Sequence, residues 1–462
     1  MSNYKPTIGI EIHLELNTKT KMFSCAPNIF GGEANTNVAP TDIAYPGTLP
    51  VLNKEAVISG IKLAKALKMK IDNELHFDRK NYFYPDLPKG FQITQQRRPI
   101  GSNGILELKD SSVTLERIHL EEDTAKSSHN SNMTTLDYNR AGVPLIEIVT
   151  NPVITSAKQA REYVEMIRDI ARTLNISDAR MEQGSMRVDI NISLSDTDTL
   201  GTKVEIKNMN STANIEKAIS NEIELQTQAL EKKEVIKQTT KRFDEETQSN
   251  KVMRSKSDAI DYKYFAEPNI PIIKLEKDFI ESIKIPILPL QRRDNYLALG
   301  IQEEFVDKLM SNLYQANYFD LIDVKDKVKL SKIFFAEVVS LANSKGVAVK
   351  ELNINPNELA KAINYSIEGK ISSKQLKELI TKIVDFNKTD EIIEKFGMKQ
   401  ISSEKELLPI IEKVIDKLKD QIEANKDRPE RISKIILGNV MKETGGKANP
   451  QVTSKLVSKI LK

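Results

Sequence analysis

The chain has 462 residues, and its 39% hydrophobic and 29% charged content is ordinary for a globular protein, which excludes a disordered chain. At roughly 150 residues per domain, this length predicts about three domains. The 68 basic and 65 acidic residues leave a net charge of +3, which excludes a global field that would draw the whole chain onto nucleic acid or a membrane.

The first residues carry no secretory pattern. Lys5, Glu11 and Glu15 interrupt the apolar residues where a signal peptide needs an unbroken apolar stretch. No window holds the roughly 18 uninterrupted apolar residues that predict a membrane-spanning helix. Cys25 is the single cysteine, so a disulfide within the chain and a zinc site built on a cysteine pair are excluded. We therefore expect a cytoplasmic protein with no membrane partner.

The segment from Ile8 to Leu16 predicts a half-buried strand. Its apolar residues occupy every second position, and Gly9, Glu11, His13 and Glu15 lie between them, so one face is apolar and the other ionisable. The same period of two recurs over 186–194 and 204–206. Strands covered on one side only favour an antiparallel sheet over a doubly wound parallel one. The first domain is therefore predicted to be α+β.

Helices are predicted between and after these strands. Apolar residues recur at spacings of three and four over 160–174, behind a possible N-cap at Ser156, and again over 213–230. Both helices are expected to be packing elements. From Arg293 onward the strand patterns fade and short helices dominate. We predict a catalytic domain at 1–290, an all-α domain at 291–399 and a small α-helical tail domain at 400–462.

Acidic residues stand beside histidine or basic residues on several predicted strands. The groups are Glu11 with His13, His119 with Glu121, Glu122 and Asp123, Glu147, and Glu182 with Asp189. On any single strand such acids are most simply a solvated face. The apolar neighbours of Glu147 make its carboxylate the sharpest case, because a buried carboxylate needs a partner, and a bound cation is the simplest one.

Oxygen-rich ligands with at most one imidazole suit a hard ion such as Mg²⁺. A zinc site usually contains more nitrogen and sulfur ligands, and this chain has only four histidines and one cysteine. We predict Mg²⁺ and no zinc. Because Mg²⁺ usually accompanies phosphate, a nucleotide is the expected companion. The chain contains neither a G-x-x-x-x-G-K-[ST] loop nor a G-x-G-x-x-G fingerprint, so metal and basic side chains must hold any phosphates.

The run FDRKNYFYPDLPKGFQ, residues 77–92, supplies such basic groups. Arg79, Lys80 and Lys89 alternate with aromatic residues that include Tyr82. Aromatic rings can stack a base while lysine and arginine hold phosphate. A packed aromatic loop with surface lysines explains the composition equally well.

The C-terminal segment 429–462 is basic. Seven lysine and arginine residues face two glutamates, which gives +5. Within it, TGGKANPQ (residues 444–451) ends one helix at the glycines and starts the next at Asn449 and Pro450. Lysines around such a helix-loop-helix can bind nucleic-acid phosphates, although a solvated basic surface is an equal alternative from the residues alone.

Several long motifs together resemble the B subunit of the aspartyl/glutamyl-tRNA amidotransferase family, and the resemblance spans essentially the whole chain. The motifs are IGIEIHLEL (8–16), AYPGTLPVLNK (44–54), FDRKNYFYPDLPKGFQ (77–92), HLEED (119–123), NRAGVPLIEIV (139–149), SDARMEQGSMRVDINIS (177–193), KVEIKNMNS (203–211), DYKYFAEPNI (261–270) and GKANPQ (446–451).

The resemblance implies a fold and an activity. The fold is a cradle domain similar to that of glutamine synthetase, followed by a helical domain and a tail that contacts tRNA. The activity is the ATP- and Mg²⁺-dependent phosphorylation of the side-chain carboxylate of glutamate on tRNA(Gln), followed by transamidation with ammonia to give glutaminyl-tRNA(Gln). The implied partners are an amidase, which is the A subunit and supplies the ammonia, and a small C subunit, in a heterotrimer. Aspartate-charged tRNA(Asn) is an alternative substrate.

The resemblance also implies site residues by motif position. The implied catalytic residues are Glu11, His13, Glu122, Lys80, Lys89 and Arg117. The implied metal-site residues are Glu11, His13, Glu121, Glu122, Glu147, Glu182 and Asp189. The implied ATP- and substrate-binding residues are Arg79, Lys80, Tyr82, Lys203, Lys207 and Asn208. The implied tRNA-binding residues are Arg431, Lys434, Lys442, Lys447 and Lys455.

Two departures from the family pattern bear on the site. Gln183 stands where many members carry a second acid, which weakens the case for Glu182, and Cys25 alone cannot form the cysteine-rich zinc knuckle of some members. Two other functions stay open: a stand-alone carboxylate-amine ligase that acts on a free acid, and a non-enzymatic scaffold that docks tRNA for a catalytic partner.

Overall fold

The structure is a computed structural model that describes residues 3–130, 133–255, 261–398, 401, 403–423 and 428–461. The chain divides into two compact units, Met1–Arg292 and Arg293–Lys462. None of the helices in the described ranges is long and apolar enough to cross a membrane.

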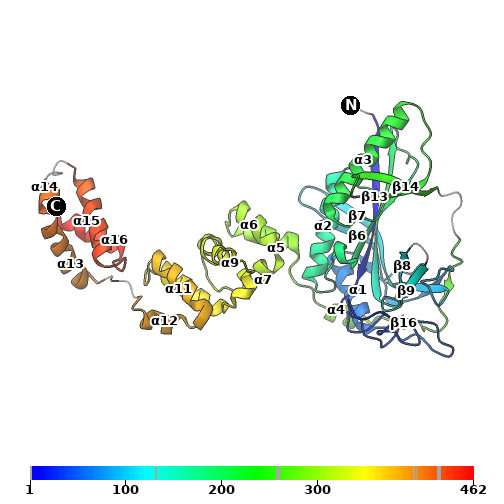
Figure 1. The fold of residues 1–462 in the computed structure, drawn as a ribbon, viewed down its shortest axis with the longest axis horizontal. Helices are drawn as coiled ribbons and strands as arrows, with labels where there is room; N and C mark the ends of the chain where they lie inside the picture. The colour runs from blue at the N-terminus through cyan, green and yellow to red at the C-terminus, as the bar shows by residue number, and fades with distance from the viewer. Residues whose placement is uncertain are drawn as a thin grey trace. The chain divides into compact units, whose positions relative to one another are not determined.

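The first unit is built on one large sheet (Figure 1). Its nine described strands are, in spatial order, β14 (Ser249–Ser255), β13 (Thr239–Asp244), β12 (Val204–Lys207), β11 (Met186–Ser195), β1 (Lys5–Glu15), β10 (Pro144–Thr150), β7 (Ser112–Glu122), β6 (Gly101–Glu107) and β2 (Lys70–Ile71). The predicted strand at 8–16 lies in the middle of this sheet. The α+β class is therefore confirmed.

The sequence patterns favour antiparallel strands over a doubly wound parallel sheet, and the described pairings of the large sheet are antiparallel except one. β12 and β13 pair in parallel, whereas the neighbouring pairs on either side are antiparallel. The reason is the connection between them, because helix α3 (Thr212–Glu231) carries the chain back to the starting end of the sheet before β13 begins.

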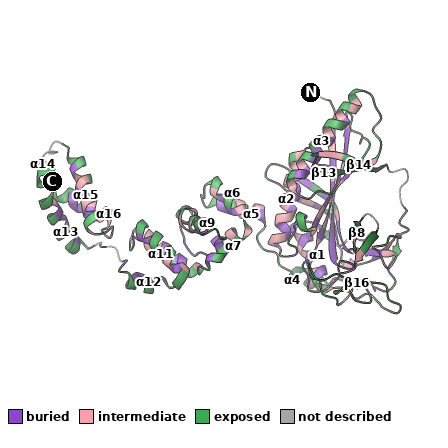
Figure 2. Ribbon diagram, viewed as in Figure 1, coloured by how far each residue is buried: buried purple, intermediate pink, exposed green. Residues whose placement is uncertain are grey.

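Helices cover one face of the sheet. α1 (Lys54–Ala66), α2 (Ala157–Thr173) and α3 lie on one side of it, whereas β8 and β9 lie on the other side (Figure 1). α2 and α3 confirm the helices predicted from periodicity, and the Ser156 side chain caps α2 by accepting a hydrogen bond from the Gln159 N–H at 3.1 Å. Buried residues line the interface between the helices and the sheet (Figure 2). This core contains Ile8, Ile10 and Ile12 of β1, each at most 1% exposed.

Short strands and one short helix complete this unit. They are β3 (Glu74–Leu75) with β16 (Ile273–Lys274), β4 (Asp78–Asn81) between β5 (Phe91–Thr94) and β15 (Phe265–Ala266), β8 (Lys126–Asn130) with β9 (Met133–Asp137), the 3₁₀ turn η1 (Met181–Gln183), and α4 (Lys277–Ser282). In the run 77–92, the first residues form β4, the last begin β5, and residues 82–90 are the loop between them.

The second unit is entirely helical where it is described. Its elements are α5 (Pro289–Ala298), which starts just before the unit boundary, α6 (Glu303–Met310), α7 (Leu313–Asp320), α8 (Lys327–Ile333), the π-helix η2 (Phe334–Val339), α9 (Ser340–Lys345), the 3₁₀ turn η3 (Val349–Leu352), α10 (Pro356–Ile367), α11 (Ser373–Phe386), α12 (Thr389–Lys395), α13 (Glu404–Lys417), α14 (Lys419–Glu423), α15 (Pro429–Glu443) and α16 (Pro450–Ile460).

Two hydrophobic clusters lie in this unit. One runs from Tyr296 to Met398, and the other runs from Leu407 to Val457 and joins α13, α15 and α16. The predicted boundary at 399/400 lies outside the described residues, so the three-domain division remains a prediction. In the tail, the Asn449 side chain caps α16 and Pro450 takes its first turn, as predicted.

The apolar face of β1 generates a stability prediction. Ile12→Ala removes a fully buried side chain from the centre of the sheet and is expected to lower the free energy of unfolding by about 2–5 kcal/mol. Urea unfolding followed by circular dichroism measures the change. Val235→Ala is the control, because that side chain is 85% exposed and its loss should change stability little. Equal effects of the two substitutions would contradict the assigned face of β1.

Candidate functional site

The strand registers align ionisable residues across the sheet. His13 of β1 lies opposite Arg187 of β11 on one side and opposite Glu147 of β10 on the other. Glu147 in turn lies opposite His119 of β7. Because directly opposed residues point to the same face of a sheet, these four side chains form one row on the face away from α2 and α3.

Two glutamates flank this row. Glu11 lies two residues before His13 on β1, and Glu121 lies two residues after His119 on β7. The two-residue spacing keeps each glutamate on the same face as its histidine. Glu11, His13, His119, Glu121 and Glu147 are hereafter called the carboxylate–histidine cluster.

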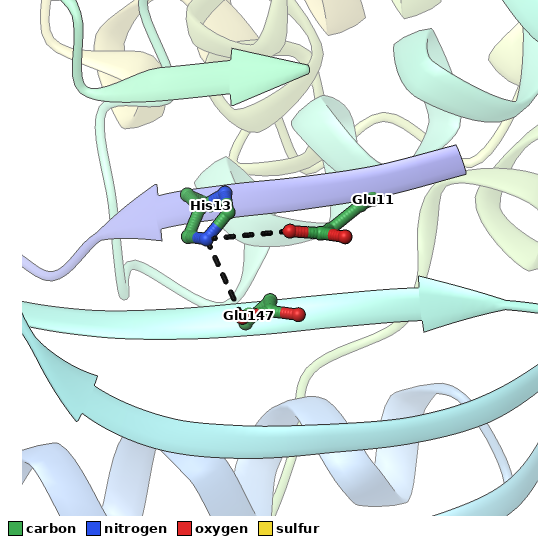
Figure 3. Close-up of side chains that lie close together, drawn as sticks. All are labelled: Glu11, His13 and Glu147. Carbon is green, nitrogen blue, oxygen red and sulfur yellow. Dashed lines mark ion pairs between the residues drawn. The ribbon is translucent and has the colours of Figure 1, made fainter. Parts of the chain in front are cut away.

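The cluster is tight. Figure 3 shows His13 between Glu11 and Glu147, and its Nε2 atom lies 3.7 Å from Glu11 Oε1 and 3.4 Å from Glu147 Oε2. The same atom lies 3.5 Å from Glu121 Oε1. The His119 Nε2 atom lies 3.5 Å from Glu121 Oε2 and 3.1 Å from Glu147 Oε2. Two overlapping ligand sets result, one of Glu11, His13 and Glu147 and one of His119, Glu121 and Glu147. In each set the potential ligand atoms lie within 4.8 Å of one another, and Glu147 belongs to both.

Burial and charge shift the pKa values within the cluster. Burial opposes the charge on His119, but Glu147 and Glu121 outweigh it and raise the His119 pKa to about 10. The pKa of His13 is raised for the same reason. Burial also opposes the charge on Glu147, yet His119 and His13 hold the pKa of that carboxyl well below its usual range. Protons on the two imidazoles thus offset part of the negative charge of the three carboxylates, a role that a divalent cation can take over when the imidazoles become neutral ligands.

His119 is a potential ligand that sequence reasoning misses. The residue stands out in the HLEED motif, but its position beside Glu147 depends on the pairing of β7 with β10, which the sequence does not reveal. One signal is available in the sequence. The E-x-H spacing of Glu11 and His13 is mirrored by the H-x-E spacing of His119 and Glu121, and both place two ligands on one strand face.

Glu122 does not join the cluster. It alternates with Glu121 along β7, and its buried carboxylate instead pairs with Lys89 and accepts a hydrogen bond from the Ile93 N–H at 3.0 Å. Burial raises the pKa of Glu122, and the Lys89 charge works against that rise. These two predicted catalytic residues therefore form a buried ion pair with each other.

Asp189 and Glu182 have different surroundings. Asp189 lies opposite Glu11 on the neighbouring strand, and its Oδ2 accepts from Lys207 Nζ at 2.6 Å. Burial works against the Lys207 charge, but Asp189 and Glu205 raise the Lys207 pKa to about 12. Glu182 is exposed on η1, before β11 begins, and is not brought to the cluster.

The hairpin of β4 and β5 carries three of the predicted ATP- and substrate-binding residues, Arg79, Lys80 and Tyr82. Lys80 lies 4.9 Å from the centre of the Tyr262 ring, and the charges of Glu121 and Glu147 raise its pKa although burial works against them. Lys80 is therefore close enough for the carboxylates of the cluster to stabilise its positive charge. Arg79 binds the buried Glu267 carboxylate at 2.5 and 3.1 Å, which holds its guanidinium in a structural pair.

The remaining predicted residues of this unit are scattered. Tyr82 packs edge-on against Tyr262 at 5.9 Å between ring centres. Arg117 lies two residues before His119 on β7 and binds the neighbouring Glu116 at 2.5 Å. Lys203 and Asn208 are exposed on either side of β12.

The predicted tRNA-binding residues lie on and between the last two helices. Arg431, Lys434, Lys442 and Lys455 are exposed, and Lys447 is half-buried in the turn between α15 and α16. A cavity of about 520 Å³ is lined by both helices, with Ser433, Lys434, Ser454 and Ser458 among its polar lining residues.

The shared ligand generates a metal-binding prediction. Glu147→Gln removes the carboxylate common to both ligand sets and should weaken Mn²⁺ binding by at least about tenfold, measured by electron paramagnetic resonance. Glu182→Gln is the same change outside the cluster and should leave the affinity unaltered. Similar losses from both substitutions would show that the ion binds elsewhere.

Comparison with known proteins identifies the family of the chain. A family model described as the GatB/GatE catalytic domain matches residues 6–281, and one described as the GatB domain matches residues 318–461. The first match contains every member of the carboxylate–histidine cluster, and the second contains the basic helices of the tail.

Full-length relatives share one name, that of the B subunit of an aspartyl/glutamyl-tRNA(Asn/Gln) amidotransferase. The relative in Mycoplasmopsis agalactiae is 54% identical and that in Mycoplasmopsis pulmonis is 52% identical, in each case over 100% of this chain and 99% of the relative. The relative of the same name in Mycoplasma capricolum is 42% identical over 99% of both chains. The chain therefore belongs to the family of B subunits of the aspartyl/glutamyl-tRNA(Asn/Gln) amidotransferases.

Proposed function

We propose that this chain is the cytoplasmic component that activates and amidates glutamate carried on tRNA(Gln), using ATP and Mg²⁺. The carboxylate–histidine cluster is the observation that carries the proposal. It gathers five potential ligands on the open face of a sheet whose other face is packed with apolar residues. The likeness of the first domain to the glutamine synthetase cradle belongs to the same proposal.

The residues present fit a divalent cation. Three carboxylates supply the oxygen ligands that Mg²⁺ prefers, and two imidazoles can complete the set, although they would also accept a softer ion. Glu147 can serve two neighbouring ions because it belongs to both ligand sets. When bound, Mg²⁺ would neutralise phosphate charge during phosphoryl transfer.

The surrounding side chains suit an anionic substrate. Lys80 holds a positive charge close to Glu121 and Glu147, and Arg117 extends from the same strand as His119. In the absence of a glycine-rich phosphate loop, these side chains would orient the phosphates of ATP. The Lys89–Glu122 pair lies at the end of β7, where it can hold or move a proton without competing for the ion.

The chemistry explains why phosphate is needed. A carboxylate is a poor acyl donor because its leaving group would be oxide. Transfer of the γ-phosphoryl group of ATP to the glutamate carboxylate releases ADP and provides phosphate as the leaving group. Ammonia then attacks the acyl carbon, phosphate departs, and one proton is lost to give the amide. The cluster and its basic neighbours stabilise the charge that moves in the first step.

Other proteins and tRNA are part of the proposal. The relatives are named as one component of an amidotransferase that acts on tRNA, so a separate amidase would supply ammonia and a small third protein would complete a heterotrimer. The exposed basic residues of α15 and α16 would contact the tRNA backbone. Aspartate-charged tRNA(Asn) is a second substrate to test.

Reconstitution tests the activity. The full chain, mixed with the amidase and the small third protein, glutamine, ATP, Mg²⁺ and glutamate-charged tRNA(Gln), should form glutaminyl-tRNA. Glu147→Gln should lower the rate by at least about 10²-fold, because it removes a ligand from both sets. Glutamine hydrolysis by the amidase is the control for assembly and should persist.

Other outcomes identify the alternatives. Amidation of free glutamate with no response to charged tRNA would indicate a stand-alone ligase. Full transamidation by the Glu147→Gln and His13→Ala variants would indicate that this chain only docks tRNA for a catalytic partner.

The basic tail generates a separate prediction. Replacing both Arg431 and Lys434 by glutamate should weaken tRNA binding and reduce the slope of log affinity against log salt by about 1 for each lost phosphate contact. Filter binding at several salt concentrations measures both quantities. The double variant Lys158→Glu and Lys277→Glu, at side chains 74% and 86% exposed on α2 and α4, is the charge-matched control. If the double variant at Arg431 and Lys434 leaves the slope of log affinity against log salt unchanged, these two residues of the tail do not contact the tRNA backbone.

A further inference from the structure

Two arginines converge on one buried carboxylate beside the cluster. The Arg187 side chain on β11 donates from Nη2 to Asp123 Oδ2 at 2.8 Å, and Arg140, in the turn after β9, donates from Nε to the same oxygen at 2.7 Å. The other oxygen of Asp123 accepts from the Thr124 N–H at 2.8 Å. Asp123 itself is 5% exposed. A single carboxylate oxygen is therefore shared between two guanidinium groups.

The arginine donors outnumber these acceptors. A guanidinium carries five N–H donors. Within the described part of the chain, the Arg187 Nε atom is buried without a hydrogen-bond acceptor, and so is Arg140 Nη2. The latter atom lies 2.7 Å from Asp123 Oδ2 but is not aligned for a bond, and Glu15 approaches Arg140 only to 3.5 Å. Unpaired buried donors are costly, so an acceptor from outside the chain would satisfy them.

The arginine pair lies beside the cluster. Arg187 is directly opposite His13 in the pairing of β11 with β1, so both side chains are on the same face of the sheet. The Arg187 side chain is 40% exposed and that of Arg140 is 30% exposed, so a ligand can reach them. An anion held here would be next to a cation held by His13 and Glu147.

Asp123 and Glu15 are the carboxylates that face the two arginines, so the charges of the group match in number. The hydrogen bonds do not match, because both guanidinium groups donate to Asp123 Oδ2, whereas Glu15 lies 3.5 Å from Arg140. The planar fork of a guanidinium matches the two oxygens of a carboxylate or a phosphate, which the point charge of a lysine does not.

We propose that Arg187 and Arg140 form an anion-binding site that takes a phosphate or carboxylate oxygen of the substrate beside the carboxylate–histidine cluster. The inference rests on the proposed function for the identity of that anion. It can be the terminal phosphate of ATP or the side-chain carboxylate of the tRNA-bound glutamate, and both offer the same paired oxygens to the guanidinium groups.

Arg187→Lys separates binding from structure. Lysine keeps a positive charge that pairs with Asp123, but it lacks the two parallel N–H donors of a guanidinium. The urea unfolding midpoint should therefore be unchanged, whereas the affinity for the ligand should fall. Two equilibrium measurements on the assembled complex identify the ligand. One is the affinity for a non-hydrolysable ATP analogue with Mg²⁺. The other is the ratio of affinities for glutamate-charged and uncharged tRNA(Gln).

The expected result is a loss of at least about tenfold in one of these two quantities. Weaker binding of the ATP analogue assigns the site to phosphate, and a lost preference for charged tRNA assigns it to the carboxylate. Arg98→Lys is the matched control, because its side chain is 38% exposed and its donors bind Asp72 and Glu74, and it should alter neither quantity.

Unchanged values of both quantities in Arg187→Lys would overturn the inference. Arg140→Lys repeats the test at the second arginine. If Arg187→Lys shifts the unfolding midpoint, the binding data for Arg140→Lys test the inference instead. Binding does not require turnover. A wild-type complex that binds both ligands but forms no glutaminyl-tRNA would therefore count against the proposed function and leave this inference to be judged on the binding data.

Discussion

The register of β1 against β11 and β10 is the constraint on which the rest of the site depends. Glu11 and His13 alternate with Ile10, Ile12 and Leu14, which are at most 1% exposed. A shift of one residue would turn two ionisable side chains into the core and three apolar ones out to solvent. The apolar face of β1 therefore fixes which residues of β10 and β11 stand beside His13. Hydrophobic burial on one face determines the electrostatics of the other.

The open face gathers charges that would be unstable if left alone. Three carboxylates lie within 4 Å of imidazole nitrogens, and Glu121 and Glu147 are both less than 10% exposed. Such groups persist when counter-charges accompany them, and here protonated imidazoles provide those charges. A divalent cation could replace these protons as the counter-charge, because each imidazole can then act as a neutral ligand.

The end of the helical unit has its own packing and its own charge. Its last helices have a hydrophobic cluster formed from Leu407 to Val457, and they carry an excess of basic residues in a chain whose overall charge is only +3. A local positive field of this kind can attract the phosphates of a nucleic acid even though the chain as a whole is almost neutral.

The sequence alone was sufficient to identify the half-buried strands, the two long helices of the first unit and the caps of the last helix, because each depends on a local period or on one capping residue. Its long motifs also pointed to the family that the comparisons confirm.

The tertiary structure determined which residues form the site. His119 joins the cluster and Glu122 pairs with Lys89, although the two glutamates of HLEED are adjacent in sequence. The parallel pairing of β12 with β13, the isolation of Glu182 on η1 and the convergence of Arg140 and Arg187 on Asp123 likewise depend on strand pairing. The physical reason is that a side chain's face follows from local alternation, whereas its neighbours depend on contacts between strands far apart in the chain.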